Sequence, residues 1–196
     1  MGLEFELKYK ADAAVQQRIL EDLGPWQECA MATTYYDTPS GSLSARHYTL
    51  RCRMENQVPV CTVKTPAGDL ARGEWELSGE ADIRRAIPVL CEMGAPADLE
   101  ELTQEGVLPI CGARFLRKTT LLEVGDTLLE LAVDQGILFA GEREIPLCEV
   151  EVELKAGGME TAAAWASILA RRYGLEPEPL SKFKRASMLR GNNHAG

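Results

Sequence analysis

Residues 148–154 read CEVEVEL, in which three glutamates alternate with apolar residues. Successive side chains of a β-strand point to opposite faces, so Glu149, Glu151 and Glu153 share one face and the valines share the other. Side chains two apart on a strand lie roughly 7 Å apart, so this acidic row repels itself inside a partly closed site. A divalent cation would relieve the repulsion, because hard cations bind carboxylate oxygens. The stretch therefore predicts a strand and marks an acidic face.

Similar alternation along the chain predicts a mainly antiparallel β structure. Strands are expected at residues 3–9, 30–37, 47–55, 58–65, 70–78, 112–123, 126–134 and 146–155, with a weaker one after Gln135-Gly136. Helices are expected at 12–23, at 160–172, and as two short segments within 81–106, where Pro88 and Pro96 act as breaks. We expect an α+β fold with one domain over residues 1–190 and a flexible C-terminal tail at 191–196.

The polar faces of the predicted strands carry bases and acids on different strands. Arg51, Arg53 and Lys64 lie on adjacent strands, whereas Glu4 and Glu6 precede a single lysine near the N-terminus. Because an antiparallel sheet normally wets one face, each strand taken alone is also explained as a surface strand. The separation of the two charges favours a site for a metal–polyphosphate complex, in which Arg supplies forked donors and Lys a point charge.

Composition excludes several other classes of protein. A net charge of −9 argues against a nucleic-acid backbone as the main partner. The two histidines are too few for a histidine-based zinc site, and the six cysteines form no Cys-x-x-Cys pair and are expected as small buried apolar residues. Apolar runs are too short to span a bilayer and the N-terminus is acidic, so we expect a cytoplasmic protein with no membrane partner.

The segment Glu4-Phe5-Glu6-Leu7-Lys8 resembles the E-x-E-x-K signature of the CYTH, or triphosphate tunnel metalloenzyme, superfamily. Further matching blocks follow in family order at residues 35–39, 50–53, 62–64, 72–76, 115–117, 132–136, 148–154 and 180–182. The blocks extend over nearly the whole chain and are most similar to those of bacterial inorganic triphosphatases. The resemblance implies an eight-stranded antiparallel β-barrel, closed around a charged tunnel and flanked by helices.

The resemblance also implies a division of labour among the charged residues. The implied ligands of Mg²⁺ or Mn²⁺, in a two-metal site, are Glu4, Glu6, Glu149, Glu151 and Glu153. The implied triphosphate ligands are Lys8, Arg51, Arg53, Lys64, Arg72, Arg117 and Lys182. The implied catalytic residues are Lys8, Glu74, Glu76 and Asp134, where the acids would hold a second metal or position the attacking water. Thr119 stands where the family often has a second base, and Lys184 and Arg185 are expected on a solvated helix face.

The implied activity is hydrolysis of a triphosphate, with inorganic triphosphate cleaved to diphosphate and phosphate through two-metal activation of water. Thiamine triphosphatase, nucleoside triphosphatase and class IV-type adenylyl cyclase activities would use the same charged residues and stay open. A non-catalytic module that binds polyphosphate or a nucleotide is the alternative of a different class. The expected partner is a small-molecule triphosphate, and a homodimer is left open.

Overall fold

A single antiparallel sheet organises the computed structural model, which describes residues 5–66 and 72–191 but not the side chain of Arg72. Its strands are β1 (Glu6–Lys10), β2 (Gln27–Asp37), β3 (Thr49–Glu55), β4 (Val58–Pro66), β5 (Arg72–Ser78), β6 (Leu108–Val124), β7 (Thr127–Ala140), β8 (Arg143–Ala156) and β9 (Glu176–Pro177). Within the described ranges these strands form one sheet in the order β5-β4-β3-β2-β6-β7-β8-β1-β9. The α+β class with a large antiparallel sheet is therefore confirmed.

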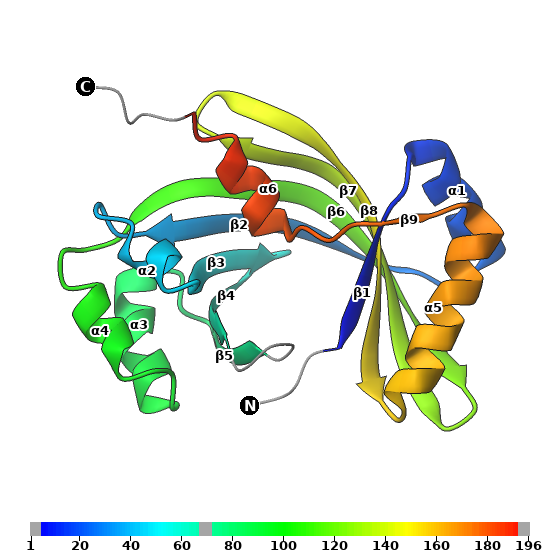
Figure 1. The fold of residues 1–196 in the computed structure, drawn as a ribbon, viewed down its shortest axis with the longest axis horizontal. Coiled ribbons are helices and arrows are strands. Elements are labelled where there is room, and N and C mark those ends of the chain that lie inside the picture. Colours follow the sequence, from blue (N-terminus) through cyan, green and yellow to red (C-terminus); the bar gives the residue numbers. More distant parts are fainter. Residues whose placement is uncertain (1–4, 67–71, 192–196) are drawn as a thin grey trace.

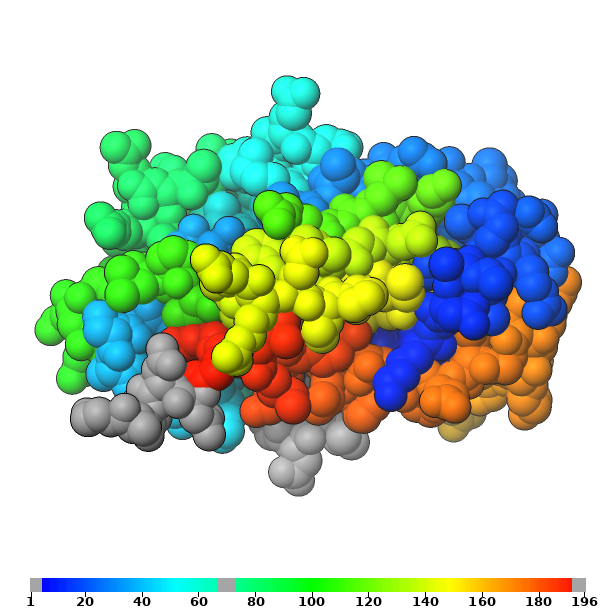
Figure 2. All heavy atoms as spheres, turned by 90° about the horizontal axis from the view of Figure 1, so that it is seen from above, coloured from blue at the N-terminus to red at the C-terminus, as the bar shows by residue number. Residues whose placement is uncertain are grey.

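Helices cover the outer face of the sheet at its two ends and touch its inner face at one place. They are α1 (Ala13–Asp22), α2 (Ser42–Ala45), α3 (Ile83–Glu92), α4 (Asp98–Leu102), α5 (Met159–Tyr173) and α6 (Lys182–Met188). Figure 1 shows α1 and α5 at one end of the curved sheet, α3 and α4 at the other, and α6 on the concave side. In Figure 2, α6 (red) lies beside the yellow segment in which β7 leads into β8. Its contacts are with β6 and β7.

Three groups of apolar side chains stabilise this arrangement. The first packs β1, β7 and β8 against α1 and α5, with Leu131 and Val150 fully buried. The second packs β3, β4 and β5 against α3 and α4, around Leu50 and Leu90. The third lies on the concave side, where α6 covers β2, β6 and β7 through the buried Ala186. The first two groups take up the outward-facing apolar residues of β1, β3, β4, β5, β7 and β8, so the charged residues that alternate with them must face the concave side.

The predicted closed barrel is not confirmed. Strands β5 and β9 are the two edges of the sheet, and no pairing joins them in the part of the chain that the structure describes. The free side of β1 is partly taken by β9, whose residues Glu176 and Pro177 pair with Lys10 and Tyr9. Proline has no N–H group to extend this ladder. The result is a strongly curved open sheet (Figure 1). Charged side chains line its inner face.

Several predicted boundaries are confirmed, and two predicted interruptions are wrong. Asp12 caps α1 by accepting a hydrogen bond from Val15 N at 2.8 Å. Gly174 ends α5 in the left-handed conformation. Pro88 lies inside α3 and does not break it. Strand β7 also continues through Gly136, where a Cβ atom would lie 2.1 Å from a carbonyl oxygen of β6. Glycine is thus needed there for close strand approach and not for a turn.

Two further sequence expectations concern the cysteines and the membrane. All six cysteines are free thiols, and three of them, Cys52, Cys61 and Cys111, are buried as expected for small apolar residues. None of the helices in the described ranges is long and apolar enough to cross a bilayer. The proposed tail at 191–196 lies outside the described residues except for Gly191.

Candidate active site

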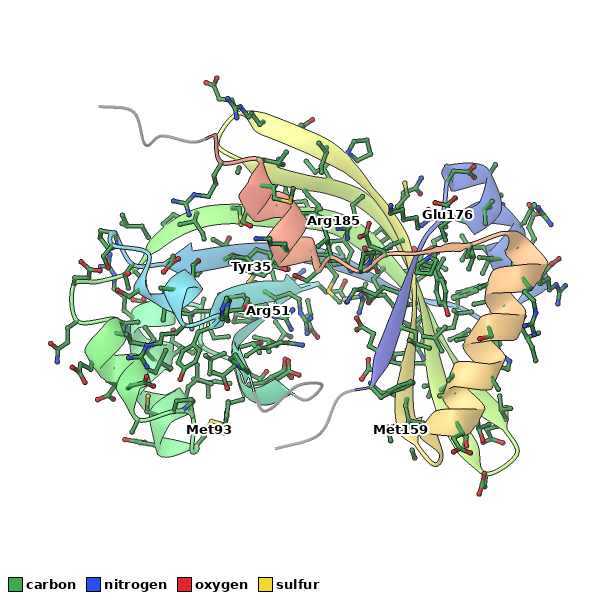
Figure 3. The ribbon with its side chains drawn as sticks, viewed as in Figure 1. Tyr35, Arg51, Met93, Met159, Glu176 and Arg185 are labelled. Atoms are coloured by element: carbon green, nitrogen blue, oxygen red, sulfur yellow. The ribbon has the colours of Figure 1, made fainter. Side chains whose placement is uncertain are left out.

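A cavity of about 990 Å³ occupies the concave face of the sheet. It gathers side chains that the sequence singled out on seven different elements. Those that line it are Glu6, Lys8, Arg51, Arg53, Lys64, Glu74, Glu76, Arg117, Glu151, Glu153 and Lys182. Figure 3 shows Arg51 from β3 and Arg185 from α6 on this concave side. The predicted Glu4 and the side chain of Arg72 lie outside the described residues.

The β3–β5 side of the cavity carries three of the predicted phosphate ligands. Lys64 Nζ lies 3.1 Å from Glu74 Oε1, its partner across the β4–β5 ladder. Arg51 Nη2 lies 3.7 Å from carboxylate oxygens of both Glu74 and Glu76. Arg53 pairs with Glu55 and lies 4.0 Å from Glu76. This side is therefore not purely basic, since acids of β5 and the end of β3 lie among its cations.

Two donors on this side have no acceptor in the part of the chain that the structure describes. Among the described residues, Arg51 Nε and Arg53 Nε are both buried and form no hydrogen bond. A buried polar group without a partner is uncommon and costs about 1–3 kcal/mol, more when it is charged. Burial is the largest influence on Arg53 and lowers its pKa, and neighbouring Arg51 lowers it further. The two guanidinium groups are thus placed to receive an anion.

The opposite side carries a cluster of buried acids. Asp134 of β7 and Glu149 of β8 face each other across the ladder, and both side chains are fully buried. Glu151 follows two residues later on β8 and is also buried. One carboxylate oxygen of each residue lies within 4.8 Å of the others. We call Asp134, Glu149 and Glu151 the acidic triad.

Three cations neutralise the acidic triad in this structure. Arg117 of β6 donates to both oxygens of Asp134 at 2.7 and 2.6 Å and also to Glu151. Lys182, the first residue of α6, lies 2.8 Å from Asp134 and 2.6 Å from Glu151, and it also binds Glu149. The cluster therefore holds closely paired charges of both signs, and Lys182 binds carboxylates here where a phosphate ligand was predicted.

The third cation of the cluster is Arg185, which contradicts the expectation of a solvated side chain. It binds Glu149 and lies 3.7 Å from Glu178. Residues three apart on a helix share a face, so Arg185 follows Lys182 onto the concave side. That spacing was the sequence signal that could have identified it. Lys184, in contrast, is exposed at the rim of the cavity.

Burial and pairing shift the pKa values of the cluster in opposite directions. Burial raises the pKa of Glu151 to about 8, against the opposing effect of Arg117. Burial also lowers the pKa of Lys182 to about 7, although Asp134 favours the charged ammonium. For Asp134, burial acts to raise the pKa, but Lys182 and Arg117 outweigh it and lower the pKa. Strongly shifted groups that converge on a cavity are typical of functional sites.

A second feature of the cluster was not anticipated from sequence. Gln16 of α1 approaches from the outer face of the sheet and is almost fully buried. Its Nε2 donates to Asp134 O at 2.9 Å and to Glu149 O at 3.1 Å. Gln16 therefore fixes the backbone from which two triad side chains project. The only signal for this role was a polar residue on the apolar face of a helix, one turn before Ile19.

The remaining candidates lie around the mouths of the cavity. Lys8 and Glu6 of β1 pair at 3.1 Å. Glu153 pairs with Lys155 at 3.1 Å, and Lys155 also lies 3.8 Å from Glu130. Thr119 lines the cavity at the position where a second base was missing. The predicted site residues that the structure describes are thus brought together around one space, with the exception of Asp134 and Glu149, which lie behind its wall.

Comparison with known proteins gives a consistent picture. The sequence profile of the CYTH domain matches residues 2–187. The inorganic triphosphatase of Haemophilus influenzae is 30% identical over 167 residues, which are 83% of this chain and 47% of that protein. The chain thus spans about half the length of this curated relative.

Solved structures share the fold at low sequence identity. HpAC1 from Hippeastrum, a candidate adenylyl cyclase described as revealing a dominant triphosphatase activity, superposes with a TM-score of 0.63 at 18% identity, covering 93% of both chains. The PH1819 protein of Pyrococcus horikoshii OT3 superposes with a TM-score of 0.64 at 19% identity, covering 93% of this chain and 97% of that one. At this identity the likeness concerns the fold.

Proposed function

This chain belongs to the CYTH domain family, and on that premise we propose that it is a metal-dependent triphosphatase. The proposed reaction is the hydrolysis of inorganic triphosphate to diphosphate and phosphate in the concave cavity. The relative of Haemophilus influenzae, named an inorganic triphosphatase, supports the choice of substrate.

One observation carries the proposal. The cavity places Arg51 and Arg53, each with a buried donor that lacks an acceptor among the described residues, opposite the acidic triad. A polyanion would satisfy the guanidinium donors, because phosphate oxygens accept forked hydrogen bonds from arginine. Lys64 and Lys8 line the same space and would add point charges along a linear phosphate chain.

The acidic triad fits a divalent metal ion. Its three carboxylates converge within 4.8 Å and offer only hard oxygen donors, as Mg²⁺ and Mn²⁺ prefer. Asp134, Glu149 and Glu151 would hold one ion, and we propose Glu6 and Glu153, with Glu4, for a second. When bound, such ions neutralise phosphate charge and lower the pKa of water.

The other residues of the chain bind and orient the substrate in this proposal. Arg51, Arg53 and Lys64 would exchange their carboxylate partners for phosphate oxygens. Glu74 and Glu76, released from these pairs, would accept hydrogen bonds from the attacking water. A polyanion bound between β3–β5 on one side of the cavity and β1 on the other would also draw these two sides together. We propose that the predicted closed tunnel forms in this substrate-bound state.

An organic triphosphate is the second candidate, because of the size of the cavity. A volume of about 990 Å³ is at the upper end for small-molecule sites and exceeds the needs of an inorganic triphosphate. Ser44, His47 and Tyr48 line it and could contact a base or another organic group. Thiamine triphosphate, a nucleoside triphosphate and cyclisation of ATP therefore belong in the same assay.

Phosphate release from inorganic triphosphate, ATP and thiamine triphosphate tests the proposal, with Mg²⁺, Mn²⁺ or a chelator and with cyclic AMP measured in the ATP sample. We expect rapid, chelator-sensitive release from inorganic triphosphate. Glu151→Ala should abolish it, while Glu142→Gln, an exposed turn residue, should retain it. Lys64→Ala should mainly raise the Michaelis constant. Turnover that survives the chelator or the Glu151→Ala change would contradict the proposal.

A further inference from the structure

Lys182 occupies the centre of the acidic triad. Its ammonium group contacts all three carboxylates, with distances of 2.8 Å to Asp134 and 2.6 Å to Glu151 and a further bond to Glu149. The ammonium of lysine is a compact point charge with three donors, and here each donor has one triad carboxylate to bind. In charge and position, Lys182 therefore resembles the cation that the triad is suited to hold.

A metal ion and the Lys182 ammonium cannot both occupy this position. Oxygen ligands bind Mg²⁺ at about 2.0–2.1 Å and larger divalent ions somewhat farther away. An ion at the centre of the triad would thus overlap the ammonium. Asp134 and Glu149 are also fully buried, whereas Lys182 and Glu151 line the cavity, so Lys182 lies between the cavity and the deeper acids.

The other two cations of the cluster do not have this property. Arg117 is fixed by a forked pair of bonds to Asp134 and does not touch Glu149 in the described contacts. Arg185 touches only Glu149 among the triad residues and is also drawn toward Glu178. Either arginine can keep most of its bonds with an ion at the centre of the triad.

Lys182 can leave the triad without unfolding α6. The helix is anchored by Phe183, whose ring lies 5.1 Å from that of Tyr35, and by the fully buried Ala186. Lys182 is the first residue of the helix and lines the cavity, so rotation of its four-carbon side chain moves the ammonium into the space that Arg51 and Arg53 also face.

We propose that Lys182 competes with the divalent cation for the acidic triad, and that the triphosphate accepts the displaced ammonium. Metal and triphosphate then bind cooperatively, because each favours the same position of Lys182. The inference rests on the proposed function and adds a coupling device to it. It also reconciles the predicted role of Lys182 as a phosphate ligand with its carboxylate contacts.

Direct binding of Mn²⁺ tests the competition without relying on turnover. Electron paramagnetic resonance of free Mn²⁺ gives the affinity of chelator-treated protein, with and without imidotriphosphate, a triphosphate analogue that resists hydrolysis. A protein-free sample corrects for the Mn²⁺ that the analogue itself binds. Lys182→Met should bind Mn²⁺ about tenfold more tightly than the parent protein, since close charge pairs couple at least this strongly. In the variant, the triphosphate analogue should tighten Mn²⁺ binding less than it does in the parent protein.

Lys118→Met is the matched control, because it removes the same charge from β6, at a position outside the acidic triad. Lys118 pairs with Glu28 at 3.0 Å on the outer side of the sheet, so its loss should change Mn²⁺ affinity less than twofold. Thermal unfolding of each variant shows whether it still folds. Without divalent ions Lys182→Met should melt below the parent protein, and Mn²⁺ should raise its melting temperature more. Lys182→Gln, which keeps polar contacts without the charge, should bind Mn²⁺ more tightly as well.

The outcomes separate this inference from the proposed function. If the parent protein hydrolyses triphosphate and binds Mn²⁺, but both Lys182 variants bind Mn²⁺ equally or more weakly, the competition is overturned and the proposed function stands. If the parent protein neither binds Mn²⁺ nor hydrolyses any triphosphate, the proposed function fails and the competition fails with it. Tighter Mn²⁺ binding in both Lys182 variants but not in Lys118→Met supports the competition.

Discussion

Arg117→Met is the change whose effect can be worked out most fully. Arg117 donates a forked pair of hydrogen bonds to Asp134, at 2.7 and 2.6 Å, and one more to Glu151. Its side chain is 15% exposed and that of Asp134 is not exposed at all. Methionine has a similar length but no charge, so the substitution leaves two buried carboxylates with one cation fewer.

The expected loss of stability follows from this geometry. Removing one partner of a buried ion pair typically costs about 3–5 kcal/mol. Lys182 stays within 2.8 Å of Asp134 and 2.6 Å of Glu151, so part of the charge remains compensated. We therefore expect the lower end, about 3 kcal/mol. For a chain of this size each kcal/mol lowers the melting temperature by roughly 2–4 °C, which gives a decrease of roughly 6–12 °C.

Urea unfolding in the presence of a chelator measures the effect. Arg114→Met is a control on the same strand, because Arg114 is exposed and lies 4.7 Å from the ring of Phe139. An exposed contact of this kind contributes about 0.5–1 kcal/mol. Adding Asp134→Asn to Arg117→Met should recover stability, because a buried charge is then removed. A loss from Arg117→Met no larger than that from Arg114→Met would refute the reasoning.

Three further predictions concern other parts of the chain. Burial raises the pKa of Glu151 in the folded protein to about 8, above its ordinary value of 4.5, so the free energy of unfolding should fall as the pH rises from 5 to 7. Glu151→Gln should remove this fall in urea titrations with chelator. Gly136→Ala should lower the free energy of unfolding by about 3 kcal/mol in the same assay, because its Cβ would lie 2.1 Å from a backbone oxygen. Gly141→Ala, which has open space around its Cβ but a φ of +58°, should lower it by about 1 kcal/mol. Gln16→Leu should lower the free energy of unfolding by about 2 kcal/mol and weaken Mn²⁺ binding, because two backbone acceptors lose their donor. Gln17→Leu, at an exposed position, should change neither.

The strands and the inward-facing charges could be predicted because they depend on local alternation. Arg51 and Arg53 face the cavity. The residues that alternate with them along β3, Leu50 and Cys52, are buried in the core that packs against α3 and α4. The same reasoning held for Glu149 and Glu151 on β8. Period-two patterns determine the face of a residue without any knowledge of the partner strand.

The parts of the site that sequence did not predict depend on contacts between distant segments. The hydrogen bonds from the Gln16 side chain to the backbone of β7 and β8 join residues more than 100 positions apart. Gly136 was interpreted as an interruption because its need for close approach comes from β6. The pairing of Lys182 with the acidic triad likewise depends on how α6 returns to the sheet. Closure of the barrel is a property of the two sheet edges, which no local pattern specifies.

The separation of the hydrophobic cores has a mechanical consequence for the cavity. One wall, β3–β5, packs against α3 and α4, and the other, β1 with β8, packs against α1 and α5, so each wall belongs mainly to its own core. The two walls are joined through β2, β6 and β7, whose own core lies under α6. Bending of these middle strands would change the distance between the walls and leave the packing of both end cores intact. Under the proposed function, such bending would let one cavity bind phosphate chains of different lengths without repacking either core.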